Sequence, residues 1–181
     1  MVEKLKTEHN VEVEWRPFYL YFDTPPEGRE LPEHVKRGRA QGSEERLRQI
    51  AAAYGMEFVS VPRIYNTRLA HEATEYARVN GKGNEFHKVV FRKVYAEGQD
   101  PSQWEVLRSA AQEVGLDADE MQREVESEKY MATVVDEVRW AYQIGVTGVP
   151  TYVINNRYAI VGAQPYEVFK DTLEQIANQK E

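Results

Sequence analysis

The stretch that most constrains the fold lies near the end of the sequence, where a helical pattern gives way to two short strands at a Val-Pro step. Residues 145–151 read GVTGVPT, with Val149 directly before Pro150. A residue before proline is restricted to extended conformations, so the preceding helix must end here and a strand can follow. The spacing alone favours an ordinary trans bond, because only about 5% of X-Pro bonds in folded proteins are cis.

Two strand-like runs follow this step, residues 151–154 and residues 158–161, and both are rich in β-branched and aromatic side chains. Asn155 and Asn156 lie between them, and asparagine tolerates the left-handed backbone conformation that tight hairpins need. Gln164 and Pro165 then open a final helix, whose apolar face is predicted to hold Val168, Phe169, Leu173 and Ile176.

The rest of the chain reads mostly as helix. Residues 2–10 look like the end of a helix, the alternating run VEVEW at residues 11–15 predicts a strand, and residues 22–43 read as an irregular loop because of their prolines and glycines. Six helical segments follow. Ser43 is predicted to cap the first helix, whose inward face would hold Leu47, Ile50, Ala51 and Tyr54. Asp100-Pro101 begins the fourth helix and Asp117 the fifth. The sixth helix covers residues 127–145.

Composition narrows the possible functions. The 181 residues contain no cysteine, which excludes disulfides and thiolate metal sites within them. The formal net charge of −7 argues against nucleic acid as the main partner, because phosphate binding favours a basic face. No apolar run approaches the length of a membrane-spanning helix, and the first residues lack a secretory signal, so we expect a cytoplasmic protein without a membrane partner. No pattern indicates a bound metal or organic cofactor.

The sequence resembles the DsbA family of thioredoxin-fold proteins over nearly its whole length, from about residue 2 to residue 178. The run at residues 145–151, the hairpin and the VGAQP run at residues 161–165 are similar to the C-terminal half of that family. The runs RPF at residues 16–18 and NTRLAH at residues 66–71 are similar to its FrnE-like branch, which is related to 2-hydroxychromene-2-carboxylate isomerase.

The resemblance implies an α/β fold, a thioredoxin-like sheet of the DsbA type with a large helical insertion. Residues 1–45 would form the N-terminal part of the thioredoxin-like domain, with a helix end, a strand and a loop. Residues 46–128 would be the helical insertion. Residues 129–181 would supply the C-terminal helix, two strands and helix of the same thioredoxin-like domain.

The resemblance also assigns a substrate-binding site. It implies that Pro150 is cis and that Val149, with Gly148 and Thr147 in the same loop, offers backbone groups to an extended substrate segment. By the same resemblance, Asn66 and His71 lie at the substrate cleft. The residues themselves favour simpler roles, because an asparagine is a good helix cap and His71-Glu72 lacks the second histidine of the H-E-x-x-H zinc motif. No metal site is predicted.

One part of the family pattern is absent. Family members begin with a strand and then carry C-x-x-C at the start of the first helix, whose N-terminus lowers the pKa of the first thiol. Neither occurs here, so no catalytic residue can be assigned. The missing strand would lie between residues 11–15 and residues 151–154. These two segments could pair directly, a second copy could fill the gap, or the natural protein carries further N-terminal residues, which is the explanation we favour.

Three functions follow, and whether the chain is an enzyme stays open. The favoured function is a DsbA/FrnE-like thiol-disulfide oxidoreductase that acts on protein or small thiols and disulfides and is redox-inactive over the residues given. The second is a glutathione-dependent isomerase of the 2-hydroxychromene-2-carboxylate type, with glutathione as a partner. The third is a non-catalytic peptide-binding protein that forms a homodimer. The Asn-Thr-Arg block and the Ala-Gln-Pro ending favour the first.

Overall fold

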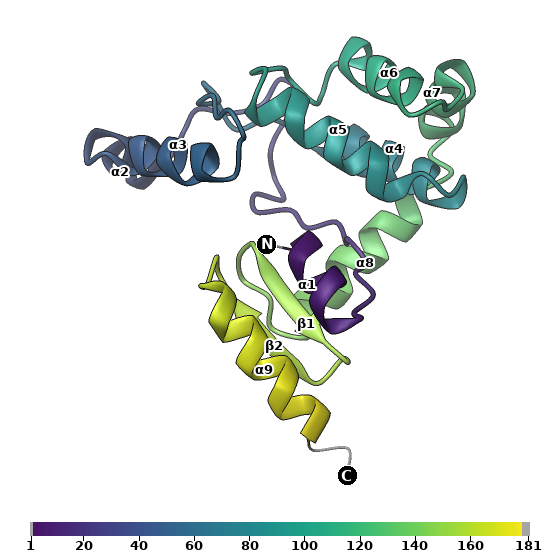
Figure 1. Ribbon diagram of the computed structural model, residues 1–181. Helices are drawn as coiled ribbons and strands as arrows, with labels where there is room; N and C mark the ends of the chain where they lie inside the picture. Colours follow the sequence, from purple (N-terminus) through teal and green to yellow (C-terminus); the bar gives the residue numbers. More distant parts are fainter. Residues whose placement is uncertain (1, 179–181) are drawn as a thin grey trace. The chain divides into compact units, whose positions relative to one another are not determined.

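The computed structural model describes residues 2–178 (Figure 1). Its contacts divide the chain into two compact units. Unit 1 combines the described residues up to Leu20 with those from Glu137 onward, and unit 2 is Tyr21–Asp136. The sequence interpretation instead places boundaries after residues 45 and 128, and that three-part division stays a prediction.

Unit 1 contains a small antiparallel hairpin with two helices against it. Its elements are α1 (Val2–His9), β1 (Thr151–Ile154), β2 (Tyr158–Val161) and α9 (Tyr166–Asn178). Thr151 lies opposite Val161, and Ile154 opposite Tyr158. Between the strands, Asn155 and Asn156 have φ values of 52° and 53°, and the Arg157 N–H donates to the Ile154 carbonyl at 3.1 Å. The predicted tight hairpin is confirmed.

One face of this hairpin carries the core of unit 1. Leu5, Ile160 and Phe169 are buried together, from α1, β2 and α9 respectively. The ring of Tyr152 meets that of Phe169 edge to face, with centroids 4.7 Å apart. The predicted inward positions Phe169 and Ile176 on α9 are buried, whereas Val168 is exposed.

Residues 11–15 do not form the predicted strand. Among the described residues, the only sheet of named strands is the pair β1–β2, so this segment has no ladder partner. Alternation of apolar and polar residues favours an extended chain, but a strand also needs a neighbour that pairs with its backbone groups. Direct pairing of this segment with β1, one of three expected arrangements, does not occur.

The next residues instead lie along the last turns of α8 (Met131–Gln143). The Arg16 guanidinium bonds Glu137 at 2.6 Å and lies over the Trp140 ring, 4.7 Å from its centroid. The Tyr142 hydroxyl donates to the Tyr19 carbonyl at 2.7 Å. These contacts hold residues 16–19 against the helix that leads into the Val-Pro step.

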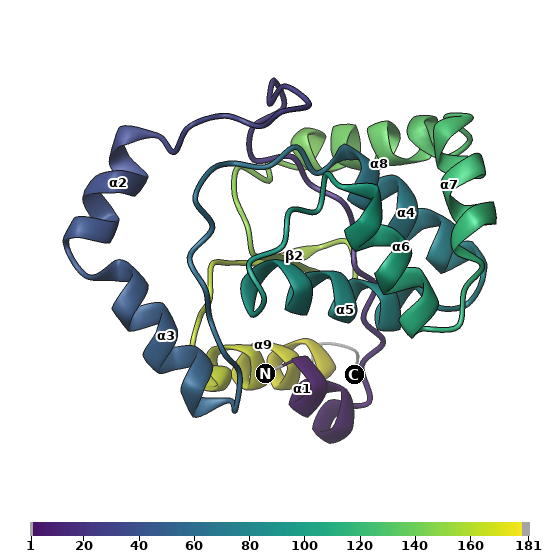
Figure 2. The same cartoon turned by 90° about the horizontal axis from the view of Figure 1, so that it is seen from above.

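Unit 2 is helical, and Figure 2 shows four of its helices gathered side by side. These are α4 (Arg68–Val79), α5 (Gly83–Tyr95), α6 (Trp104–Glu113) and α7 (Ala118–Glu126). Their buried side chains form one core, which includes Ala73, Tyr76, Phe86, Leu107 and Met121. Most of these positions recur at the three- and four-residue spacing that is typical of an amphipathic helix.

The predicted starts of these helices are partly confirmed. The Asp117 carboxylate accepts the N–H groups of Asp119 and Glu120 at 2.9 Å, as a capping aspartate should. By contrast, α6 begins at Trp104 rather than at Asp100-Pro101. The Asp100 side chain accepts the N–H of Ser102 at 2.8 Å and closes a separate turn there.

Three further expectations are wrong in the first part of unit 2. Residues 33–40, predicted as loop, form α2 (Glu33–Ala40), because the prolines end at Pro32, just before the first helical turn. α3 (Ser43–Ala53) has Gly42 rather than Ser43 at its cap. Its predicted inward residues Leu47, Ile50 and Tyr54 are exposed. Among the named helices, α3 packs against α2 rather than against the core of α4–α7.

Candidate functional site

The loop between α8 and β1 contains the four residues that the sequence places at the substrate site. The Val149–Pro150 peptide bond is cis, where spacing alone favours trans. The Pro150 carbonyl accepts the Gly162 N–H at 2.8 Å, and the Thr151 hydroxyl donates to the Gly148 carbonyl at 2.7 Å. These bonds fix the loop to the start of the hairpin. Thr147, Val149 and Pro150 are exposed, and Gly148 is half-buried.

Val149 presents its backbone to solvent. Its side chain is 52% exposed, and neither its N–H nor its carbonyl bonds another backbone group within residues 2–178. β1 begins two residues later, and in the described sheet it pairs only with β2. An unpaired strand edge with free backbone groups beside it is the surface on which an extended peptide can add as a further strand.

An exposed apolar side chain lies near the loop, on the paired side of β1. Val161 lies opposite Thr151 in the hairpin register and is 62% exposed. Its neighbour Gly162 donates to Pro150, so Val161 lies close to the loop along the chain. Within the loop and the strands themselves, the nearest charged side chain is Arg157, at the far end of the hairpin. Recognition here would therefore depend on backbone hydrogen bonds and apolar contact rather than on charge.

Asn66 and His71 lie at the start of α4, in unit 2. The Asn66 amide donates to the Thr24 carbonyl at 2.7 Å, and its oxygen accepts the Arg68 N–H at 2.9 Å. Asn66 thus fixes a distant loop to the beginning of the helix. His71 is half-buried, and its backbone N–H donates to the Thr67 carbonyl within the first turn of α4. Thr147, Gly148, Val149 and Pro150 belong to unit 1, whereas Asn66 and His71 belong to unit 2. A single site made of these six residues stays a prediction.

The burial of Glu72, the residue after His71, is not predictable from the sequence. Its side chain is fully buried, with Oε1 accepting from Arg68 at 2.9 Å and Oε2 without a hydrogen-bond partner. Burial raises the pKa of Glu72, while the charge of Arg68 partly opposes the rise. Arg68 four residues earlier on the same helix is a recognisable signal for an ion pair, but the sequence does not reveal its burial.

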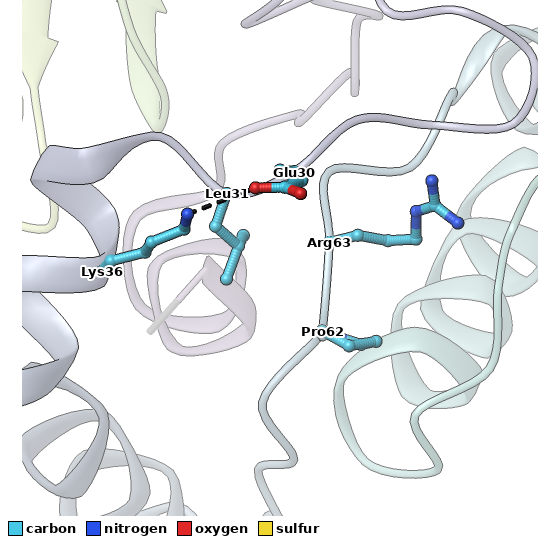
Figure 3. Close-up of a pocket in the computed structure, with 5 residues that line it drawn as sticks. All are labelled: Glu30, Leu31, Lys36, Pro62 and Arg63. Atoms are coloured by element: carbon cyan, nitrogen blue, oxygen red, sulfur yellow. Dashed lines mark hydrogen bonds and ion pairs between the residues drawn. The ribbon is translucent and has the colours of Figure 1, made fainter.

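Unit 2 also has an open hollow lined by Glu30, Leu31, Lys36, Pro62 and Arg63 (Figure 3). The Lys36 ammonium pairs with Glu30 at 3.3 Å and with Glu33 at 3.0 Å, so its charge is largely neutralised. None of the predicted site residues lines this hollow. Residues 2–178 contain no cluster of three or more metal-ligating side chains, and none of their helices is long and apolar enough to span a membrane.

Comparisons with known proteins agree with this geometry. The sequence matches the profile of the DSBA-like thioredoxin domain over residues 1–174. The uncharacterized protein YwbO of Bacillus subtilis (strain 168) is 30% identical over 167 residues, which are 91% of this chain and 82% of that protein. A short hairpin entered through a cis Val-Pro step and followed by a helix, with a helical unit earlier in the chain, defines a thioredoxin-like protein of the DsbA type.

This chain belongs to the DsbA-like thioredoxin-domain family. The crystal structure of a probable DsbA oxidoreductase from Streptomyces coelicolor is 31% identical with a TM-score of 0.68, over 76% of this chain and 60% of that one. This chain therefore spans less than two thirds of that protein. The structure of a 2-hydroxychromene-2-carboxylate isomerase aligns over 99% of this chain and 88% of the isomerase chain, with a TM-score of 0.79. The sequence identity is 18%, so this likeness shows the fold alone. The predicted fold class is confirmed.

Proposed function

We propose that this chain is the substrate-binding part of a DsbA/FrnE-like thiol-disulfide oxidoreductase, and that its own 181 residues carry out no redox step. The observation that supports this is the exposed Val149–Pro150 step, where the free backbone groups of Val149 adjoin the open edge of β1. An extended segment of a protein substrate, carrying the thiol or disulfide, would pair with the backbone groups of Val149, ahead of β1.

The redox part of the proposal follows from the chemistry of disulfide exchange. A thiolate must attack a disulfide sulfur and form a mixed disulfide, and these 181 residues contain no cysteine. Any thiolate that reacts with a bound substrate would therefore come from another molecule or segment. What the chain supplies is the position of the substrate backbone, through the free backbone groups of Val149.

The test is binding of a labelled extended peptide, a fluorescein-tagged decapeptide rich in valine and threonine, followed by anisotropy. We expect weak, saturable binding in the micromolar range. The matched control is the same peptide with alternate backbone nitrogens methylated, which cannot donate to a strand edge. Equal binding of the two peptides would contradict recognition by strand addition.

Two variants separate backbone recognition from side-chain recognition. Val149→Ala keeps both backbone groups and should bind the peptide nearly as well as the unchanged chain. Val149→Pro removes the N–H and should abolish binding, while circular dichroism checks that the fold is retained. In parallel, the chain should not accelerate reduction of insulin by dithiothreitol, and a clear acceleration would contradict the redox part of the proposal.

The same samples test the two alternative functions. Calorimetry with glutathione should show no binding, and binding of glutathione in preference to the peptide would favour a glutathione-dependent isomerase. Sedimentation should show a monomer, and a stable dimer that binds the peptide would favour the non-catalytic binding protein. We further propose a cytoplasmic location, which fractionation of the source cells can check.

A further inference from the structure

The consecutive helices α2 and α3 present a helix face that the rest of unit 2 leaves uncovered. Both views show these two helices apart from α4–α7 (Figures 1 and 2). Side-chain contacts fix the two helices to residues 60 and 61. Arg39 pairs with Glu44 at 2.6 Å and also donates to the Val61 carbonyl at 2.7 Å. Arg48 donates to the Ser60 hydroxyl at 3.3 Å. α3 is therefore held on one side, and its other side is open.

The open face of α3 is apolar. Leu47, Ile50 and Tyr54 are 47%, 50% and 61% exposed, and α3 contains no buried residue. Their spacing of three and four residues places them on one stripe of the helix, as on an amphipathic helix that packs against a partner. Met56, just beyond the helix, extends the apolar surface with 58% exposure. Such a stripe on a surface helix is a feature of interaction sites.

Charges border the stripe on both sides. On the helical wheel Arg46 flanks the stripe next to Ile50, and Glu44 and Arg48 flank it next to Leu47. The Arg46 guanidinium has no hydrogen-bond or ion-pair partner within the part of the chain that the structure describes. Residues 33–54 carry five basic and three acidic side chains, a net charge of +2 in a chain of net charge −7. Residues 33–54 are a basic region on an acidic protein, so their charge favours an acidic partner.

We propose that the open face of α3, formed by Leu47, Ile50 and Tyr54 with Arg46 at its border, binds an acidic amphipathic helix of another protein. Apolar side chains at every third or fourth position of the partner would cover the stripe, and its carboxylates would pair with Arg46. A second copy fits this surface less well. An antiparallel α3 pair places Arg46 against the uncharged residues 51–53 of the other copy, and a parallel pair places it against Arg46 itself.

The test uses a synthetic acetylated peptide of about 18 residues that spans roughly five helical turns, with leucines at every third or fourth position and glutamates at its borders. Binding is followed by anisotropy of a fluorescein label. We expect saturable binding that weakens as salt is raised. Arg46→Glu should weaken binding about tenfold, and Ile50→Ser by at least about tenfold. The matched control is Val79→Ser, because Val79 is also exposed but lies on α4; it should bind unchanged.

The other outcomes each overturn the proposal. A peptide with lysines in place of the glutamates should not bind, and equal binding would show that charge plays no part. Concentration-dependent dimerisation that Ile50→Ser abolishes would identify a second copy as the occupant. Binding to phosphatidylglycerol vesicles, with no binding of the acidic peptide, would identify a lipid surface. A large fall in thermal stability for Ile50→Ser would show that the face packs within this chain.

Discussion

Glu72 is a buried acid whose ionisation should depend on the fold. Its carboxyl group is fully buried and its Oε2 has no hydrogen-bond partner, so the neutral form is favoured in the folded state. Because folding raises its pKa above the usual 4.5, the folded state holds this proton more tightly than the unfolded state. Its contribution to stability therefore falls as the pH rises from about 4.5 through the folded-state pKa.

Glu72→Gln should therefore be more stable than the unchanged chain at about pH 8, by about 1 kcal/mol, and the difference should shrink toward about pH 5. The glutamine oxygen can still accept from Arg68, whose side chain is 45% exposed and can be solvated. Urea unfolding at the two pH values measures the difference. The control is Glu85→Gln, on an exposed stretch of α5, which should show no such trend. A strong loss of stability at both pH values would contradict the prediction.

Asn66 is a second residue whose contacts can be tested one at a time. Its amide nitrogen donates to the Thr24 carbonyl and its oxygen accepts from the Arg68 N–H. Asn66→Asp keeps the acceptor, loses the donor and places a charge against a carbonyl, so it should cost about 1–2 kcal/mol. Asn66→Ala loses both bonds and should also speed amide exchange at Arg68. If Asn66→Asp retained full stability, the bond to Thr24 would not contribute to it.

At the level of elements, the hairpin turn gives the clearest prediction. Asn155 and Asn156 both have positive φ, and glycine adopts this conformation without the strain that a side chain causes. Asn156→Gly should therefore stabilise the hairpin by about 0.5 kcal/mol, whereas Asn156→Val should destabilise it by about 1–2 kcal/mol. Amide exchange at Arg157, whose N–H closes the turn, measures both effects. Opposite signs for the two variants would show that the turn conformation is different in solution.

The elements that the sequence predicts correctly are those with a local cause. The hairpin has its asparagines, α7 has its capping Asp117, and the helices of unit 2 have apolar residues at helical spacing. The wrong predictions depend on distant partners. Residues 11–15 alternate as a strand does, but no described strand pairs with them. α3 has the apolar spacing of a helix that packs on a core, but none of its residues is buried. Local patterns specify the conformation of a segment, and tertiary contacts decide whether it is buried or paired.

The candidate site shows the same division. The sequence locates the Val149–Pro150 loop through a family resemblance that covers most of the chain. It does not show that the backbone groups of Val149 are unpaired or that Glu72 is buried, because both depend on how segments far apart in sequence come together. His71 and Asn66 are recognisable in the sequence as members of a motif, yet the contacts of Asn66 are those of a residue that fixes a loop.

For the whole molecule, the two units differ in how their cores are assembled. The core of unit 2 is built from α4 to α7 and from residues before α8, all within one continuous stretch of chain. The core of unit 1 is small and combines Leu5 with Ile160 and Phe169, which are more than 150 residues away in the sequence. A continuous unit with its own core can fold alone, whereas a unit made of two distant segments needs both of them.

We therefore predict that residues 21–136, expressed alone, fold into a helical domain with cooperative thermal unfolding. Residues 137–181 alone should remain unfolded, because they lack Leu5 and the rest of α1. Far-UV circular dichroism and the dispersion of amide proton shifts distinguish the two outcomes. A melt of residues 21–136 without cooperativity would mean that the helical core depends on unit 1. If that unit does fold alone, binding by α3 can be measured on residues 21–136, without the Val149–Pro150 loop.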